Sequence, residues 1–345
     1  MITELYLKNY KSFLERKIEF SPLTVLSGMN ASGKSSVIQA IRMIQKSCGD
    51  GLGDPRLDDH VSPNQLKTKL TKDDYYHLSL TKDSKDYSTE ARSIGSDSYE
   101  YASDDGQRKK DLACISYISA DRLGPKNQLP AGNASEIADV GVNGEYAIAF
   151  LDKFRYSKVL ESLRLNADSV NLFDNVNAWL SVISKGTLLS YENNQSQNAY
   201  FPAYDGISPS ETGFGLSFTL PVIIALLYND EKKSERIVMI ENPEAHLHPA
   251  AQTSLGLLIA LAAASGKQVI IETHSDHIID GIRIATKQNK IHSSDVKIHF
   301  FKRNSFEEET SIETPELYQD GRLSFWPEGF FDQSLKDKAL LARKN

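Results

Sequence analysis

Cysteine is scarce in this sequence, and the patterns in which cysteine binds metals are missing. The 345 residues include only two cysteines, Cys48 and Cys114. Neither is part of a Cys-x-x-Cys pair or of the Cys/His spacing that is typical of zinc ligands. The sequence therefore argues against a disulfide framework and against a structural zinc site. We expect two reduced thiols, as in a cytosolic protein.

Long hydrophobic runs are also missing. The longest apolar stretches, LSFTLPVIIALLY and LGLLIALAAA, are shorter than the roughly 20 residues that a membrane-spanning helix needs. The first residues, MITELYLKNYKSF, carry charges and no apolar core, which is unlike a signal peptide. We therefore expect two buried helices in place of membrane spans, no membrane partner and a cytoplasmic location.

An excess of basic residues, the usual footprint of a nucleic-acid-binding protein, is absent as well. The net charge is −7 and the isoelectric point is about 5.7. The densest basic cluster, GQRKK at residues 106–110, is short, and such clusters are usually solvated loops. Composition therefore disfavours a surface that is basic throughout, and it leaves a local contact with nucleic acid open.

The order of apolar patterns along the chain predicts an α/β fold. Strand-like stretches at the start lead into a glycine-rich turn and a helical pattern. Residues from about 50 to 110 are polar and alternating, which predicts a hairpin-rich insertion, and residues from about 133 to 200 show helical spacing, which predicts a helical insertion. The last third alternates between strands and helices and predicts a largely parallel central sheet. We expect a single domain over residues 1–345.

The strongest motif is GMNASGKS at residues 28–35, which matches G-x-x-x-x-G-K-[ST] at every fixed position. It lies between a predicted strand and a predicted helix, where backbone N–H groups and the helix dipole can hold phosphates. Lys34 would reach the β- and γ-phosphates, and the Ser35 hydroxyl would bind Mg²⁺. The residues expected to bind the nucleotide here are Asn30, Ala31, Ser32, Gly33, Lys34, Ser35 and Ser36.

Two further elements have residues suited to the same reaction. The strand RIVMIE ends in Glu241, which we expect to be the second Mg²⁺ ligand beside Ser35, because Mg²⁺ prefers hard oxygen ligands. The strand KQVIIE is followed by His274, at the sheet edge where ligands of α/β proteins bind. We expect His274 to contact a γ-phosphate.

A fourth element, GFGLS at residues 213–217, begins an apolar helix. Such a glycine-rich helix start is suited to binding an anion. One triphosphate is already accounted for by the first loop, so the residues alone leave two interpretations open. GFGLS is either a second anion-binding site or a flexible entry to the helix.

These four elements, in this order, resemble the ABC-type ATPase heads of the SMC/RecF-like branch, and especially the OLD-like (overcoming lysogenization defect) AAA ATPases. The phrases IENPEAHLHP, ETHSDHIIDGIR and GRLSFWPEGFFDQ strengthen the resemblance. It implies a P-loop NTPase fold with a mixed β-sheet, ATP and Mg²⁺ as cofactors, and a head-to-tail homodimer that encloses ATP. GFGLS would then be the signature loop, with Gly215 and Ser217 facing the nucleotide of the other copy. His274 would be the switch histidine, and Arg122, in SADRLGP, would lie near a loop that senses the γ-phosphate.

The sequence departs from this family pattern in ways that affect function. Glu241 stands where many such heads have Asp, and Asn242 stands where they have the catalytic Glu. No heptad pattern is long enough for the coiled-coil arm of SMC proteins. The chain also leaves no room after Asp332 for a Toprim nuclease domain, so we expect that it does not cut nucleic acid itself.

Asn242 can orient a water molecule but cannot accept its proton, so we expect a slow ATPase. The candidate catalytic residues are Glu241, Asn242, Glu244 and His274. The resemblance suggests the ATPase of a bacterial anti-phage defence system that acts as a dimeric switch and controls a separately encoded effector, such as a nuclease. The alternatives are a DNA-repair or DNA-end-binding ATPase, a transporter ATPase subunit, and a nucleotide-binding scaffold without turnover.

Overall fold

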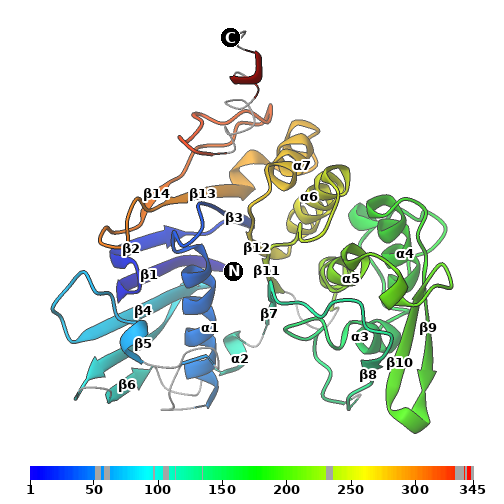
Figure 1. Cartoon of the computed structure of the whole chain (residues 1–345), viewed down its shortest axis with the longest axis horizontal. Coiled ribbons are helices and arrows are strands. Elements are labelled where there is room, and N and C mark those ends of the chain that lie inside the picture. Colours follow the sequence, from blue (N-terminus) through cyan, green and yellow to red (C-terminus); the bar gives the residue numbers. More distant parts are fainter. Residues whose placement is uncertain are drawn as a thin grey trace. The chain divides into compact units, whose positions relative to one another are not determined.

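The computed structural model describes residues 1–50, 56–57, 63–95, 98–103, 109–112, 114–133, 135–230, 236–330, 338 and 340–342. The chain divides into two compact units (Figure 1). The first unit comprises Met1–Cys114, Val296–Tyr318 and Arg322–Asn345, and the second comprises Ile115–Asp295 and Gln319–Gly321. The GQRKK cluster lies mostly outside the described residues.

An antiparallel sheet of five strands occupies the first unit, in the order β2-β1-β4-β5-β6. Its strands alternate between buried and partly exposed residues, as a sheet with one covered face requires. The described part of the polar insertion therefore forms the hairpins that its sequence predicts. The strands are β1 (Ile2–Tyr10), β2 (Phe13–Glu19), β4 (Tyr75–Lys82), β5 (Lys85–Ser93) and β6 (Tyr99–Ser103).

The first unit also contains the strand and helix on either side of the P-loop. Strand β3 (Leu23–Gly28) pairs in parallel with β13 (Val296–Lys302), which pairs antiparallel with β14 (Ser311–Glu313). Helix α1 (Lys34–Asp50) packs against β1, β3, β4 and β5 (Figure 1). Its apolar residues recur at helical spacing and are fully buried. These buried residues are Val37, Ile38, Ile41 and Ile44. Two short helices, η1 (Pro63–Gln65) and α2 (Lys109–Leu112), also lie in this unit.

The second unit has an α/β core. Strands β12 (Gln268–Glu272), β11 (Ile237–Glu241) and β7 (Ile115–Ile118) lie side by side in that order, and all pair in parallel. Their near-continuous burial is typical of a parallel sheet that is covered on both faces. The helices of this core are α5 (Phe214–Leu227), α6 (Pro249–Ala264) and α7 (Asp276–Lys287), followed by η6 (Ser293–Asp295). The expected alternation of strands and helices in the last third is confirmed.

The segment predicted to be a helical insertion is only partly helical. The bounds of its helices are α3 (Ala147–Lys153), η3 (Glu161–Leu163) and α4 (Leu172–Ile183). The part after α4 forms a β-hairpin, in which the rings of Tyr191 and Tyr200 pack against each other across the strand pair. Its strands are β9 (Leu189–Asn194) and β10 (Ala199–Tyr204), with β8 (Leu129–Pro130) beside β10. Two 3₁₀ turns lie nearby, η4 (Gln195–Gln197) and η5 (Pro209–Glu211).

The two long apolar stretches form buried helices, as expected. LSFTLPVIIALLY forms most of α5, which is buried from Thr219 to Leu227, and LGLLIALAAA lies within α6. Helix α5 continues through Pro221. In the parts of the chain that are described, no helix has both the length and the apolarity needed to cross a membrane.

Candidate functional site

The P-loop of the first unit joins β3 to α1. Strand β3 ends at Gly28, and α1 begins at Lys34, so the motif lies between a strand and a helix N-terminus as predicted. Gly28 has a φ angle of 135°, and a Cβ atom added there would lie 2.1 Å from the carbonyl oxygen of Phe301. Only glycine fits this close approach between the loop and β13.

Side chains within the P-loop bond to its own backbone. The Ser32 hydroxyl donates to the Met29 carbonyl at 2.7 Å. The Lys34 ammonium donates to the same carbonyl at 2.7 Å and to the Gly28 carbonyl at 3.2 Å. Lys34 is only 3% exposed. Hydrogen bonds within the P-loop thus hold its backbone in place. Ser35 and Ser36 follow in the first turn of α1.

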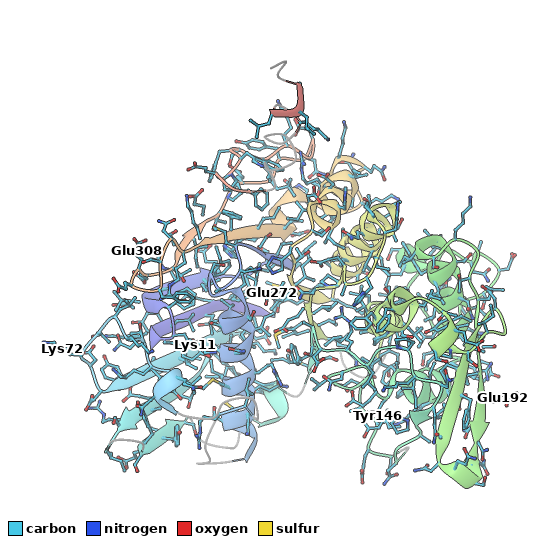
Figure 2. All side chains as sticks on the ribbon, in the orientation of Figure 1. Lys11, Lys72, Tyr146, Glu192, Glu272 and Glu308 are labelled. Carbon is cyan, nitrogen blue, oxygen red and sulfur yellow. The ribbon has the colours of Figure 1, made fainter. Side chains whose placement is uncertain are left out.

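The second unit brings two carboxylates to the ends of neighbouring strands. Glu241 ends β11, and Glu272, which is labelled in Figure 2, ends β12. The two residues are partners in the parallel register. Side chains of paired residues point to the same face of a sheet, so these two carboxylates are neighbours. The Asn242 N–H donates to the Glu272 carbonyl at 2.8 Å, which continues the pairing by one residue. Glu272 is 5% exposed.

Arg122 holds the backbone at this strand end. Its guanidinium donates to the carbonyls of Ser119 at 2.8 Å, Glu241 at 2.7 Å and Asn242 at 2.6 Å. It also lies over the Phe218 ring of α5, 5.5 Å from the ring centre. Burial lowers the pKa of Arg122 to about 10, against the opposing effect of nearby carboxylates, so it is charged at neutral pH. These contacts give Arg122 a positioning role at the strand end, and its place near a loop that senses the γ-phosphate stays a prediction.

Glu244 and His274, both predicted from the sequence, lie together. The Glu244 carboxylate accepts hydrogen bonds from the His274 N–H at 2.7 Å and from the Thr273 hydroxyl at 2.8 Å. Burial raises the pKa of Glu244, and these hydrogen bonds and the charge of Arg122 oppose the rise. Glu244 thus ties the loop after β11 to the loop that follows β12. The His274 side chain is exposed.

The GFGLS residues begin α5, but Gly215 and Ser217 have different neighbours. Gly215 lines a groove of about 250 Å³, together with His246 and residues of α4. A Cβ atom at Gly215 would lie 2.8 Å from the His246 carbonyl oxygen, so the two segments are in close contact. Ser217 instead lines a cavity together with Tyr204. Burial raises the pKa of Tyr204 to about 12, and Ser217 opposes the rise. At the helix start Phe214 is 52% exposed.

The residues expected for a nucleotide site therefore fall into two groups. Asn30 to Ser36 lie in the first unit, and Glu241, Asn242, Glu244 and His274 lie in the second. The donor chemistry fits Mg²⁺ and phosphate, because a serine hydroxyl and a carboxylate are hard oxygen ligands. Among the described residues, no group of three or more His, Cys, Asp or Glu side chains is arranged to hold a metal ion by itself.

Sequence analysis missed two residues of interest. Glu272 has a signal in the sequence, because KQVIIE ends in an acid just as RIVMIE does. The other is Thr310, which is fully buried against the P-loop. The sequence around Thr310 has no motif that indicates this contact.

Comparisons with known proteins give a family and a fold for this chain. Residues 23–280 match the family model AAA_21, described as "AAA domain, putative AbiEii toxin, Type IV TA system". Residues 291–341 match a second model, DUF3696, described as a protein of unknown function. The Old nuclease of Escherichia phage P2 is 29% identical over 119 residues, which cover 31% of this chain and 20% of the phage protein. The chain thus matches about a fifth of that relative's length.

Solved SMC heads share the fold. An SMC head bound to the C-winged helix domain of ScpA is 15% identical, with a TM-score of 0.61 over 92% of this chain and 98% of that chain. An Smc head with an extended coiled coil, bound to the C-terminal domain of ScpA derived from Pyrococcus furiosus, is 12% identical, with a TM-score of 0.58 over 99% of each chain. At such low identity, these structures establish the fold alone.

Proposed function

This chain belongs to the AAA_21 family of AAA domains and has an SMC-head-like fold related to OLD-like proteins, and we propose that it is a slow ATPase whose ATP-bound dimer is a switch. The observation that carries the proposal is the P-loop. It is formed between β3 and the start of α1, with the fixed residues of the motif in place.

The P-loop is suited to a nucleoside triphosphate with Mg²⁺. Its backbone N–H groups and the N-terminus of α1 provide a positive potential for the β-phosphate. In the proposed complex Lys34 exchanges its bonds to the Gly28 and Met29 carbonyls for bonds to the β- and γ-phosphates. Ser35 and Glu241 are the proposed ligands of Mg²⁺, which when bound offsets the charge of the phosphates.

Glu272 is our candidate for the proton acceptor that Asn242 cannot be. It is buried and lies beside the proposed metal ligand Glu241. In the proposed step, the oxygen of a water molecule forms a bond to the γ-phosphorus while the bond from that phosphorus to the β–γ bridging oxygen breaks. ADP leaves with the bonding electrons, and the water proton passes to the Glu272 carboxylate. Asn242 orients the water with its side-chain amide.

Glu244 and His274 have supporting roles in this scheme. Both oxygens of the Glu244 carboxylate accept bonds from the loop after β12. We therefore propose that Glu244 positions His274, and that the exposed His274 side chain contacts the γ-phosphate.

The dimer is proposed on the basis of the second unit's exposed helix start. Gly215 and the exposed Phe214 lie at the N-terminus of α5, where N–H groups suit an anion. In the proposed dimer this surface, with Gly215 and Ser217, faces the ATP of the other copy.

A role in defence against phages is the biological setting that we propose. It is supported by the family description, which names a toxin of a toxin–antitoxin system, and by the similarity to a phage nuclease. In this setting ATP closes the dimer, and the closed form controls a separately encoded effector.

The test of the switch is the mass of the protein in sedimentation velocity without nucleotide, with Mg²⁺-ATP and with Mg²⁺-ADP. Glu272→Gln should accumulate the ATP-bound form, and Lys34→Ala is the control that cannot bind. We expect the mass of Glu272→Gln to double with ATP, and the mass of Lys34→Ala to stay unchanged. A mass that does not respond to ATP in either the wild type or Glu272→Gln would refute the dimer switch.

A further inference from the structure

Residues 291–341 match a family of unknown function, and β13 and Thr310 within this segment lie against the P-loop in the first unit. We propose that Thr310 on this segment is a positioning residue that holds the P-loop in its phosphate-binding form, so that this segment sets nucleotide affinity. The proposal rests on the function proposed above, because it concerns the same P-loop. The family description gives no function for residues 291–341, and the proposal gives Thr310 in this segment a role in nucleotide binding.

The segment contacts the P-loop first through β13. Phe301 of β13 is the register partner of Gly28, and its carbonyl accepts a hydrogen bond from the Met29 N–H at 3.3 Å. The tight fit of Gly28 against that carbonyl leaves no room for a side chain. The start of the P-loop is therefore fixed to β13.

The second contact is the Thr310 hydroxyl, which reaches the middle of the loop. Its oxygen lies 2.8 Å from the Ser32 carbonyl oxygen and 2.7 Å from the Ser12 hydroxyl oxygen. Because a carbonyl can only accept, the Thr310 hydrogen goes to Ser32, and the Ser12 hydroxyl donates to Thr310. The Thr310 N–H also donates to the Ser12 carbonyl at 3.0 Å. Thr310 is fully buried, so water does not compete for these bonds.

The contact of Thr310 with the Ser32 carbonyl determines the direction of the Gly33 N–H, which is one of the proposed phosphate-binding donors. In a trans peptide the C=O and the N–H that follows it point in opposite directions. The bond from Thr310 to the Ser32 carbonyl therefore directs the Gly33 N–H away from Thr310. Gly33 has a φ angle of 101° and packs against Ser12 and Phe13, with no space for a Cβ atom. The orientation of this peptide is thus fixed from two sides.

The loop that carries Thr310 is itself held in place. The Arg303 guanidinium donates to the carbonyls of Glu308 at 2.8 Å and Phe306 at 2.7 Å. The Glu309 carboxylate accepts a bond from the Leu14 N–H at 3.1 Å and lies 3.5 Å from the Arg16 guanidinium. The connection between β13 and β14 is therefore a preformed support, which lowers the cost of ordering the P-loop when phosphate binds.

The test compares Thr310→Val, which keeps the shape and removes the hydroxyl, with Thr310→Ser, which keeps the hydroxyl. The matched control is Thr24→Val, because Thr24 is equally buried in the same unit and bonds only to Ser21 among the contacts described. Two readouts are used. The first is the affinity for a fluorescent ADP analogue with Mg²⁺, together with KM and kcat for ATP. The second is amide hydrogen exchange of residues 28–36 without nucleotide, which does not depend on any activity.

We expect Thr310→Val to weaken binding of the analogue and to raise KM about 5- to 10-fold, the effect of one lost hydrogen bond, with kcat changed less than about twofold. Exchange in residues 28–36 should become faster, and Thr310→Ser should restore both readouts. Thr24→Val should lower the melting temperature without changing either readout. If Thr310→Val does not fold, Ser12→Ala removes the other partner of Thr310 and should act in the same direction.

The outcomes separate the two proposals. If the wild type binds the analogue and Thr310→Val binds equally well with unchanged exchange, the positioning role is wrong and the ATPase proposal stands. If Thr24→Val loosens the P-loop as much as Thr310→Val, the effect is general destabilisation and the positioning role is also wrong. If the wild type binds no nucleotide but Thr310→Val still speeds exchange in residues 28–36, the structural role stands and the ATPase proposal fails.

Discussion

The P-loop of the first unit and the strand-end cluster of the second unit are built in different ways. The P-loop is one run of consecutive residues, 28–35, and its proposed donors are mostly backbone N–H groups. The strand-end cluster combines side chains from three segments, residues 119–122, 241–244 and 272–274. A site made from backbone depends on local sequence, whereas a site made from distant side chains depends on the fold that brings them together.

The two regions also differ in how closely they keep the residues expected for an ATPase. The motif residues of the P-loop are all present, while the strand-end cluster has Asn242 in place of the expected acid. We interpret the P-loop as the part that binds and the cluster as the part that sets the rate. Substitutions in the two regions should therefore affect different quantities.

The largest effect is expected from Lys34→Ala. Lys34 is the buried cation of the P-loop, and its loss should lower kcat/KM for ATP by at least about 10³-fold, because it removes a charge that stabilises the transferring phosphate. The measurement is ATP hydrolysis and nucleotide binding. Lys46→Ala, in the same helix, is the control and should change kcat/KM less than about twofold. Wild-type binding by Lys34→Ala would break the assignment of the P-loop.

Glu272→Gln should separate rate from binding. If Glu272 accepts the water proton, kcat falls about 10²-fold, in the range for loss of a general base, while ATP affinity is retained. The exposed Glu192 of β9, also labelled in Figure 2, gives the control Glu192→Gln, which should leave kcat unchanged. Equal kcat values for Glu272→Gln and the wild type would show that the proton leaves by another route.

Arg122→Met tests how the cluster is held together. Removing the guanidinium leaves the part-buried carbonyls of Ser119, Glu241 and Asn242 without this donor, and the free energy of unfolding should fall by about 2 kcal/mol. The exposed Arg92 supplies the control Arg92→Met, expected to change it by less than about 0.5 kcal/mol. Urea unfolding measures both, and equal stabilities would contradict the positioning role of Arg122.

The smallest effect is a pH dependence from Glu244. Burial raises its pKa in the folded protein above the ordinary value of 4.5, so between these two values the folded state binds more protons than the unfolded state. The contribution of Glu244 to stability should therefore fall as pH rises through this window. Glu244→Gln removes this titration. The measurement is the difference in the free energy of unfolding between the wild type and Glu244→Gln, taken at a series of pH values. This difference, wild type minus variant, should fall as the pH rises. A difference that stays constant or rises would contradict the burial of the Glu244 carboxylate.

Features that depend on local sequence could be predicted, whereas contacts between distant residues could not. The P-loop, the helices α1, α5 and α6, and the hairpins of the polar insertion follow from local motifs and periodicity. The hairpin of β9 and β10 was missed, because short alternating stretches with polar turns were included in a helical pattern. The contact of Thr310 with Ser32 joins residues 278 positions apart, and no local pattern could indicate it.

The most direct test of the account is the steady-state rate of ATP hydrolysis by the purified wild type with Mg²⁺, measured beside Lys34→Ala. The account predicts turnover that is clearly above that of Lys34→Ala and well below the enzyme median of about 10 s⁻¹. A wild-type rate equal to that of Lys34→Ala would contradict the assignment of hydrolysis. A rate near the median would contradict the slow switch.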